Sequence, residues 1–287
     1  MESYRTFIGF LHICVAVSFA PINLRILYVL LKNDLRKTEC YRIMAQIQFF
    51  SFLNTQFFIM FGIMMISKSS LNGLVSSSAS LLDATTNAVV IMDMILALNR
   101  LKVMFDWRIP QKVFLVLQWF TWLFATFDLI LLLTPLAGYA LSDDLSMVLP
   151  NIDLPFTAYV SYVDTCFNAI CSLLSLSAYV VIVSYLIVKK CQSSLVQSTV
   201  SEIPILVQAV LRFVGDLTVQ LLFQLLFITE LETLDVLDQI LALLLLINYV
   251  CLPPLSYIAI NRSKCSTCCL QYKDLSSLCQ SAHTFIM

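Results

Sequence analysis

The chain has 287 residues, of which 60% are hydrophobic and only 12% are charged, and its formal net charge is −1 at pH 7. Soluble domains carry about a quarter charged residues, and a water-soluble fold of this length cannot bury so much apolar surface. These numbers exclude an ordinary soluble domain and predict a chain that is solvated largely by lipid.

Seven apolar runs are long enough to cross a bilayer, which takes about 20 helical residues. In chain order they are Phe7–Leu31, Tyr41–Ile66, Leu74–Leu101, Val113–Leu136, Thr157–Val188, Ile205–Ile228 and Leu237–Ile260. The third run carries many polar residues in its first half, so we expect it to lie centrally, shielded from lipid by other helices. The sequence predicts an all-α seven-transmembrane helix bundle over residues 1–260, followed by a short tail over 261–287. Because apolar sequence begins at Phe7 and runs on without an A-x-A-like site, we expect no cleavable signal peptide.

Lysine and arginine residues are distributed asymmetrically between the predicted loops. Nearly all of those outside the spans follow spans one, three, five and seven, whereas the opposite side carries only Arg5 and Lys68 beside several aspartates and glutamates. Cytoplasmic loops of membrane proteins are enriched in Lys and Arg. The amino terminus is therefore predicted to lie outside the cell and the carboxyl terminus in the cytoplasm.

The third span ends in Asn99-Arg100 at its predicted cytoplasmic end, with Lys102 two residues further on. One interpretation is that Arg100 and Lys102 only anchor the span by extending their charged groups to the lipid phosphates. The other is a signalling role for Arg100. A polar pair at the end of the third of seven spans occupies the place where G-protein-coupled receptors keep an Asp-Arg or Glu-Arg pair.

Three stretches resemble the nematode serpentine chemoreceptors of the G-protein-coupled receptor superfamily, in classes near T and X. They are NDLRKTECYRIM before span two, LALNRLKVMF at the end of span three and NYVCLPPLSYIAINRSKC at the end of span seven. The resemblance covers the chain from Phe7 to about Cys269. It implies a chemosensory receptor for olfaction, placed in the plasma membrane and in the cilia of sensory neurons. It also implies a small-molecule ligand and a heterotrimeric G protein as partners.

The resemblance implies roles for several residues at the cytoplasmic end. Arg100, after Asn99, takes the place of an arginine that is restrained in the resting receptor and freed on activation to meet the G protein. Pro254 and Tyr257 take the places of the receptor P-x-x-Y motif, where we expect a kink, although prolines also bend membrane helices without any such role. The second inner loop adds two apolar coupling residues, Met104 and Phe105.

Span six carries Arg212 and Asp216 one helical turn apart, and Asp93 shares a face of span three with Arg100. A lone charge in hydrocarbon is costly, so we expect these groups to be paired. Two hypotheses stay open. The four residues form a polar lock that opens when span six moves outward, or Arg212 and Asp216 form a static pair that makes span six insertable.

The outer half of the bundle is the predicted site for a small molecule. Asp83 lies ~25 Å from Arg100 along a helix, near the outer mouth, and its carboxylate suits an amine or a polar head group. Other polar side chains are predicted at similar depth: Asn87 on span three, Tyr159, Tyr162, Asp164 and Asn168 on span five, and Gln220 and Gln224 on span six. For each of them, hydrogen bonding between helices, worth about 1 kcal/mol, is the alternative explanation.

The tail begins with a cysteine cluster at the predicted cytoplasmic surface. Cys265, Cys268 and Cys269 are predicted palmitoylation sites. A zinc site there lacks further ligands at suitable spacing, so no metal is predicted. All ten cysteines fall in spans or on the cytoplasmic side, which leaves none for an outer disulfide.

A small membrane transporter or channel is the alternative class, although the chain shows no internal repeat and only five glycines with which to break helices. An intramembrane aspartyl protease would need two aspartates in Tyr-Asp and Gly-x-Gly-Asp settings, and neither is complete. Other catalytic motifs are also missing from the sequence. We therefore predict no enzymatic activity, no cofactor and no nucleic-acid partner.

Overall fold

The structure is a computed structural model that describes residues 2–32, 38–69, 73–141, 148–192, 210–211, 213–219, 221–222 and 235–255. Its elements are α1 (Glu2–Leu31), α3 (Glu39–Ser67), α4 (Leu74–Met104), α5 (Gln111–Leu132), β1 (Tyr139–Leu141), β2 (Val148–Pro150), α6 (Thr157–Gln192), α8 (Asp235–Leu246) and the π turn η2 (Ile247–Cys251). Within these residues, five helices are long and apolar enough to cross a membrane, and a shorter apolar helix covers Ile240–Leu255. The predicted sixth span is described only as helical pieces within 210–222.

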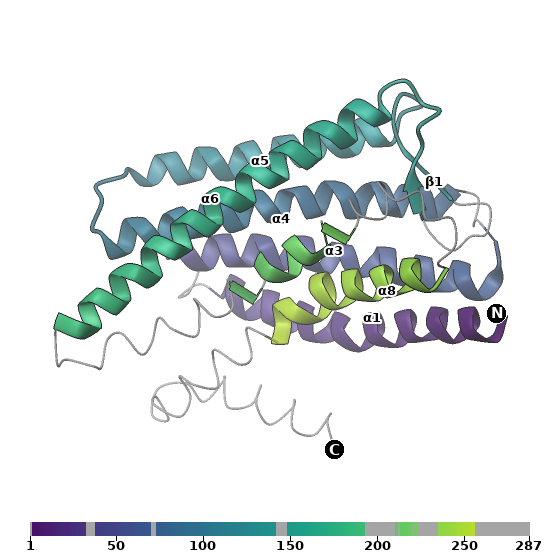
Figure 1. Cartoon of the computed structure of the whole chain (residues 1–287), viewed down its shortest axis with the longest axis horizontal. Coiled ribbons are helices and arrows are strands. Elements are labelled where there is room, and N and C mark those ends of the chain that lie inside the picture. Colours follow the sequence, from purple (N-terminus) through teal and green to yellow (C-terminus); the bar gives the residue numbers. More distant parts are fainter. Residues whose placement is uncertain are drawn as a thin grey trace, which may run out of the picture.

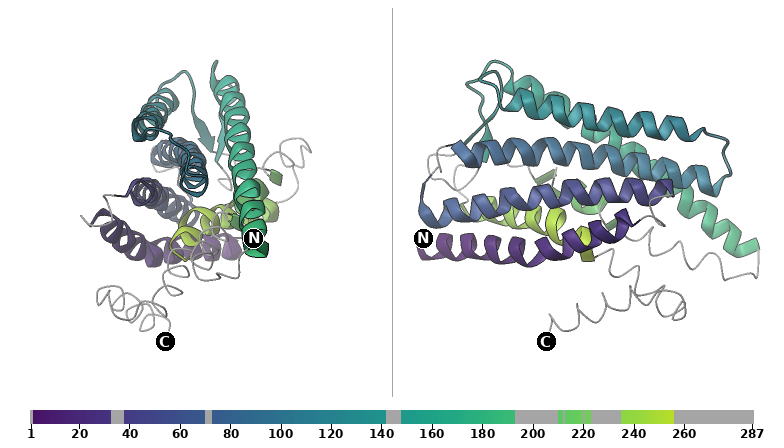
Figure 2. Two further views of the ribbon diagram at one scale, coloured as in Figure 1. Left: turned by 90° about the vertical axis from the view of Figure 1, so that its left-hand side faces the viewer. Right: turned by 180° about the vertical axis from the view of Figure 1, so that it is seen from behind.

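Helix α4 lies at the centre of the bundle, as its polar first half predicts. It packs against α3, α5 and α6, whereas α1 packs on the far side of α3 (Figure 1). In the end-on view of Figure 2, α4 lies between α3 and α5. The surrounding helices thus shield Ser80, Thr85 and Asn87 of α4 from lipid, whereas Ser77 near the start of the helix is exposed.

The bundle has two different ends. The N-terminus and the β1–β2 hairpin lie at one, here called the hairpin end (Figure 1). The opposite end holds the link between α4 and α5 and is called the basic end, after Arg100, Lys102, Arg108 and Lys112. The hairpin is antiparallel, pairs Tyr139 with Pro150, and joins α5 to α6. The loop predicted at this place therefore has regular structure.

Contacts between helices fill the core with large apolar side chains. Phe57, Phe58 and Phe61 of α3 pack with residues of α1, α4 and η2, and a second cluster joins α3, α4, α5 and α6. The outward faces are also apolar. Trp119, Leu123 and Phe127 of α5 are all largely exposed. A stripe of exposed aromatic and aliphatic side chains suits a helix that faces lipid rather than water.

Two glycines let α1 and α3 approach closely. A Cβ added at Gly62 would lie 2.7 Å from the backbone oxygen of Gly9, and one added at Gly9 would lie 2.8 Å from the backbone oxygen of Gly62. Small residues at a helix crossing are typical of membrane proteins, because close backbone packing replaces the hydrophobic drive that lipid does not supply.

The π turn η2 lies directly before Pro253 and Pro254, where the sequence predicts an irregular helix. Pro254 has no N–H to donate to the carbonyl oxygen of Val250 four residues earlier. Instead, the Nδ2 of Asn23 on α1 donates to that oxygen at 3.5 Å, and the Nε2 of Gln48 on α3 donates to the Oδ1 of Asn23 at 2.6 Å. The Val250 carbonyl thus accepts a hydrogen bond from Asn23 of α1, and Gln48 of α3 in turn donates to Asn23.

Candidate functional site

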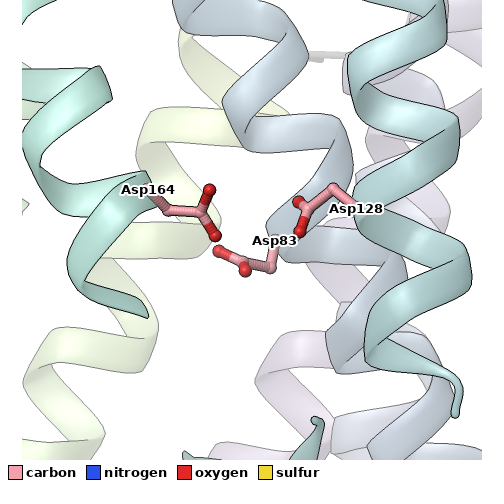
Figure 3. A group of neighbouring side chains, drawn as sticks. All are labelled: Asp83, Asp128 and Asp164. Atoms are coloured by element: carbon pink, nitrogen blue, oxygen red, sulfur yellow. The ribbon is translucent and has the colours of Figure 1, made fainter. Parts of the chain in front are cut away.

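Three carboxylates from three helices meet near the hairpin end. Asp83 lies on α4, Asp128 on α5 and Asp164 on α6, and one oxygen atom from each lies within 4.8 Å of the other two. The three side chains point toward one another (Figure 3). Asp128 and Asp164 are only 4% and 8% exposed, and Asp83 is half-buried. We call this group the acidic cluster.

The helical period places each carboxylate on the inner face of its helix. The buried residues of α5 are Phe114, Gln118, Thr121, Ala125, Asp128 and Leu132. This spacing of three or four residues marks one stripe of an α-helix. Asp164 and Asn168 continue a similar stripe on α6 that includes Thr157 and Cys171. The cluster forms because the inner stripes of α5 and α6 both face α4.

Two asparagine side chains connect the helices beside the acidic cluster. The Nδ2 of Asn168 donates to the Oδ1 of Asn87 at 2.6 Å, and the Nδ2 of Asn87 donates to the Oδ2 of Asp128 at 3.0 Å. These bonds join α6 to α4 and α4 to α5. Two buried oxygens here have no hydrogen-bond partner, the Oδ2 of Asp164 and the Oδ1 of Asn168. We call Asn87 and Asn168 the amide pair.

Tyr139 of β1 covers the acidic cluster from the hairpin. Its phenol hydrogen-bonds the carboxylate of Asp83. Burial raises the pKa of Tyr139 well above its ordinary value, and the nearby negative charge of Asp83 raises it further. Tyr139 is therefore a neutral hydrogen-bond donor at physiological pH.

The charge of the acidic cluster is not balanced by basic side chains. Over the described ranges, no Lys or Arg forms an ion pair with any of the three aspartates. Three carboxylates in a site of low dielectric cannot all stay ionised and uncompensated. The chemistry open to such a site is the uptake of protons or of a cation.

The structure brings together four of the eight residues predicted for the ligand site: Asp83, Asn87, Asp164 and Asn168. Tyr159 and Tyr162 do not join them. Each is 71% exposed, because the spacing along α6 turns it away from the inner stripe of Asp164. Gln220 and Gln224 lie outside the described residues.

Asp128 was missed by the sequence analysis, although it completes the acidic cluster. It lies in the apolar stretch TFDLILLL of the predicted fourth span. A carboxylate within a membrane span is itself a signal of function or pairing, because burying it is costly. Applying that criterion to every span would have found it.

At the basic end, Lys102 joins α4 to α3. Its Nζ lies 3.4 Å from the Oε2 of Glu39 and 4.8 Å from the ring centroid of Phe114 on α5. Asn99 is buried, and Arg100 is half-buried. These contacts give Lys102 a structural role beyond that of an anchor to lipid phosphates.

The two apolar residues predicted for coupling are half-buried. Met104 and Phe105 pack against the contact between α4 and α6. The ring of Phe105 lies 4.7 Å from that of Tyr185 on α6. Part of the apolar surface that the sequence offers to a partner is therefore used inside the bundle.

The residues predicted for the polar lock are described only in part. Asp216 is buried and accepts a hydrogen bond from the Nδ2 of Asn248 in η2 at 2.6 Å. Asp93 and Arg100 are both half-buried on α4. Pro254 is buried at the end of the described helix. The other residues predicted for the switch and for lipidation fall outside the described residues: Arg212, Tyr257, Cys265, Cys268 and Cys269.

Neither a protein-family model nor a curated protein matches the chain. Among solved structures, the crystal structure of squid rhodopsin is similar, with a TM-score of 0.69 and 10% sequence identity over 96% of this chain and 89% of that one. A likeness of this extent confirms the predicted fold class, an all-α seven-transmembrane bundle. Together with the five apolar helices, it makes the chain a multi-pass membrane protein.

Proposed function

We propose that the chain is a chemosensory G-protein-coupled receptor, related to the nematode serpentine receptors near classes T and X. It binds a small molecule at the hairpin end and activates a heterotrimeric G protein at the basic end. The observation that carries this proposal is a buried polar site inside a rhodopsin-like bundle, at the end opposite Arg100. The plasma membrane and the sensory cilium are the proposed location.

The proposed ligand site centres on the acidic cluster and the amide pair. Asp83 is half-buried, whereas Asp128 and Asp164 are buried, so Asp83 is the first of the three that a ligand from the hairpin end would meet. Apolar walls with a few fixed polar groups suit a small organic molecule. An amine or another polar head group is the chemistry that these side chains recognise.

The basic end supplies the proposed coupling surface. Arg100 and Asn99 end α4, and Met104 and Phe105 follow at the contact with α6. Because α4 and α6 both carry cluster residues, a ligand that shifts one helix against the other also moves this surface. The proposed lock of Asp93, Arg100, Arg212 and Asp216, the hinge at Pro254 and Tyr257, and lipidation at Cys265, Cys268 and Cys269 complete the switch.

A cell assay tests this function. The full chain would be expressed in a heterologous cell with sensors for G-protein dissociation and screened with small odorants that include amines. We expect a dose-dependent response that Arg100→Ala abolishes while surface expression persists. Substrate flux in vesicles without any G-protein response would instead favour a transporter or channel.

A further inference from the structure

The acidic cluster offers more negative charge than the hydrogen bonds around it offset. The described donors to the cluster are the Asn87 amide and the Tyr139 phenol, both neutral. Three carboxylates, two of them buried, face one another across no more than 4.8 Å. Like charges at this distance repel strongly where water is excluded. A bound cation would remove this repulsion.

Two unpartnered oxygens give an independent sign of a missing ligand. The Oδ2 of Asp164 is closed off from solvent, accepts no hydrogen bond and belongs to a side chain that points into the cluster (Figure 3). The Oδ1 of Asn168, one turn further along α6, is likewise buried without a partner, in a side chain that is 9% exposed. Buried oxygens are rarely left without a donor or a metal ion.

We propose that Asp83, Asp128 and Asp164 bind one divalent cation of the Ca²⁺ class, which joins α4, α5 and α6. Ca²⁺–oxygen distances are about 2.3–2.6 Å, so two ligand atoms on one ion are separated by at most about 5 Å. The spacing of the three carboxylate oxygens falls within that limit. A dication also cancels two of the three negative charges, whereas a single ammonium group cancels one.

The donor atoms select the kind of ion. The three ligands are carboxylates, and the Asn168 side chain bonds Asn87, which in turn donates to Asp128. No His or Cys belongs to the group, within the part of the chain that the structure describes. Oxygen ligands favour hard cations, and Ca²⁺ accepts irregular geometry more readily than Mg²⁺ does. Of the three carboxylates, Asp83 is half-buried and the other two are buried.

This proposal departs from the expectation of a protein without a metal. That expectation rested on the tail cysteines and did not include Asp128. The cation site uses the carboxylates of the proposed ligand site, but its test does not depend on that proposed function. A purified chain binds the ion or does not, whichever protein it couples to.

The test measures ion binding to the purified full chain in detergent micelles after removal of metal with EGTA. Tb³⁺, which replaces Ca²⁺ in oxygen sites and luminesces on binding, is titrated first and then displaced with Ca²⁺. The melting temperature is followed in parallel, with choline chloride at matched ionic strength as the control for screening. We expect saturable Tb³⁺ luminescence, displacement by Ca²⁺, and a Ca²⁺-dependent rise in the melting temperature of several degrees.

Two isosteric variants and one control assign the site. Asp128→Asn and Asp164→Asn should each weaken Tb³⁺ binding at least tenfold and abolish the Ca²⁺-dependent rise. Their melting temperatures without metal should equal or exceed that of the wild type, because charge repulsion is reduced. Asp153→Asn, at an exposed residue beside the hairpin, should bind Tb³⁺ as the wild type does. Absence of saturable binding to the wild type, or unchanged binding by both cluster variants, would overturn the proposal.

Discussion

Asn168 of α6 donates a hydrogen bond across 2.6 Å to Asn87 of α4. Toward the basic end, the rings of Phe105 and Tyr185 lie 4.7 Å apart and join the same two helices again. The pair α4 and α6 is therefore held at two levels, by a polar contact beside the acidic cluster and by an aromatic contact at the basic end. A ligand that alters the first contact acts on the second through the same helices.

Asn87 is the residue on which the polar contacts between α4, α5 and α6 converge. Replacing Asn87 with alanine removes the donor to Asp128 and the acceptor for Asn168. Buried polar groups left without partners cost about 1–3 kcal/mol, so Asn87→Ala should lower the melting temperature in micelles. Ser77→Ala, at an exposed residue of the same helix, should leave it unchanged. Equal melting temperatures for the two variants would contradict this account of the network.

The contact of α1 with α3 should be sensitive to one methyl group. In Gly62→Ala the new Cβ would lie 2.7 Å from the backbone oxygen of Gly9 and equally close to Ile13. The helices must separate, and overpacking of this kind costs about 1–3 kcal/mol. Thermal unfolding in micelles should show the loss, whereas Gln56→Ala on the exposed face of α3 should show none. An unaffected Gly62→Ala variant would mean that the two helices do not pack this closely.

Because of Tyr139, we expect the free energy of unfolding to fall at alkaline pH. Its pKa is raised in the folded chain by burial and by Asp83. The contribution of Tyr139 to the free energy of unfolding is therefore fully present below the ordinary pKa of tyrosine, about 10. It is lost as the pH rises toward the pKa of Tyr139 in the folded chain. Tyr139→Phe cannot ionise and lacks the bond to Asp83. At neutral pH it should melt below the wild type by an amount that reflects about 1 kcal/mol.

Comparing the wild type with Tyr139→Phe across pH separates the ionisation of Tyr139 from other effects of alkaline pH. The difference in melting temperature between the wild type and Tyr139→Phe should shrink above about pH 10, since only the wild type gains a phenolate on unfolding. Tyr159→Phe serves as the matched control, because that ring is largely exposed on α6. A difference that stays constant to pH 11 would show that Tyr139 does not donate to the cluster.

The membrane itself explains why so much of the fold was predictable. Lipid requires long apolar helices, so the apolar runs gave the positions of α1, α3, α4, α5 and α6 to within a few residues. The polar first half of α4 required shielding, and the central place of that helix followed. The charge distribution predicts which end faces the cytoplasm, and that orientation stays a prediction. Each of these sequence patterns reflects the surrounding lipid, which acts on every residue of a span.

Which face of a helix points into the bundle was harder to predict than how deep a residue lies in the membrane. Tyr159 and Tyr162 were placed at the right end of the bundle but lie on the outward face of α6. Depth follows from counting residues along one helix, whereas the face depends on which neighbours that helix meets. The hydrogen bonds from Asn23 to Val250 of η2 and from Gln48 to Asn23 were not predicted for the same reason, because they depend on which helices meet.

The ligand site makes a prediction that separates inward from outward side chains. In cells, Asp128→Asn should reduce the potency of an activating ligand by at least tenfold, because the buried carboxylate helps to define the proposed site. Tyr162→Ala should leave potency within a factor of about two, since its ring is largely exposed and surface substitutions cost little. Dose–response curves at matched surface expression provide the measurement. The opposite ranking would place the ligand on the outward face of α6.

The bond between Asn248 and Asp216 should hold the resting state if the polar lock exists. Asn248 lies in the π turn and donates to the buried Asp216 at 2.6 Å, which ties the last described helix to residues 213–219. In Asn248→Ala that tie is lost. A contact worth about 1 kcal/mol in one state alone shifts the balance between two states roughly fivefold, so basal G-protein activity should rise by about that factor.

Thr218→Ala, at an exposed residue of the same segment, controls for expression and folding. A normally expressed Asn248→Ala variant with unchanged basal activity would make the contact purely structural, because a switch contact cannot be removed without shifting the balance between the two states.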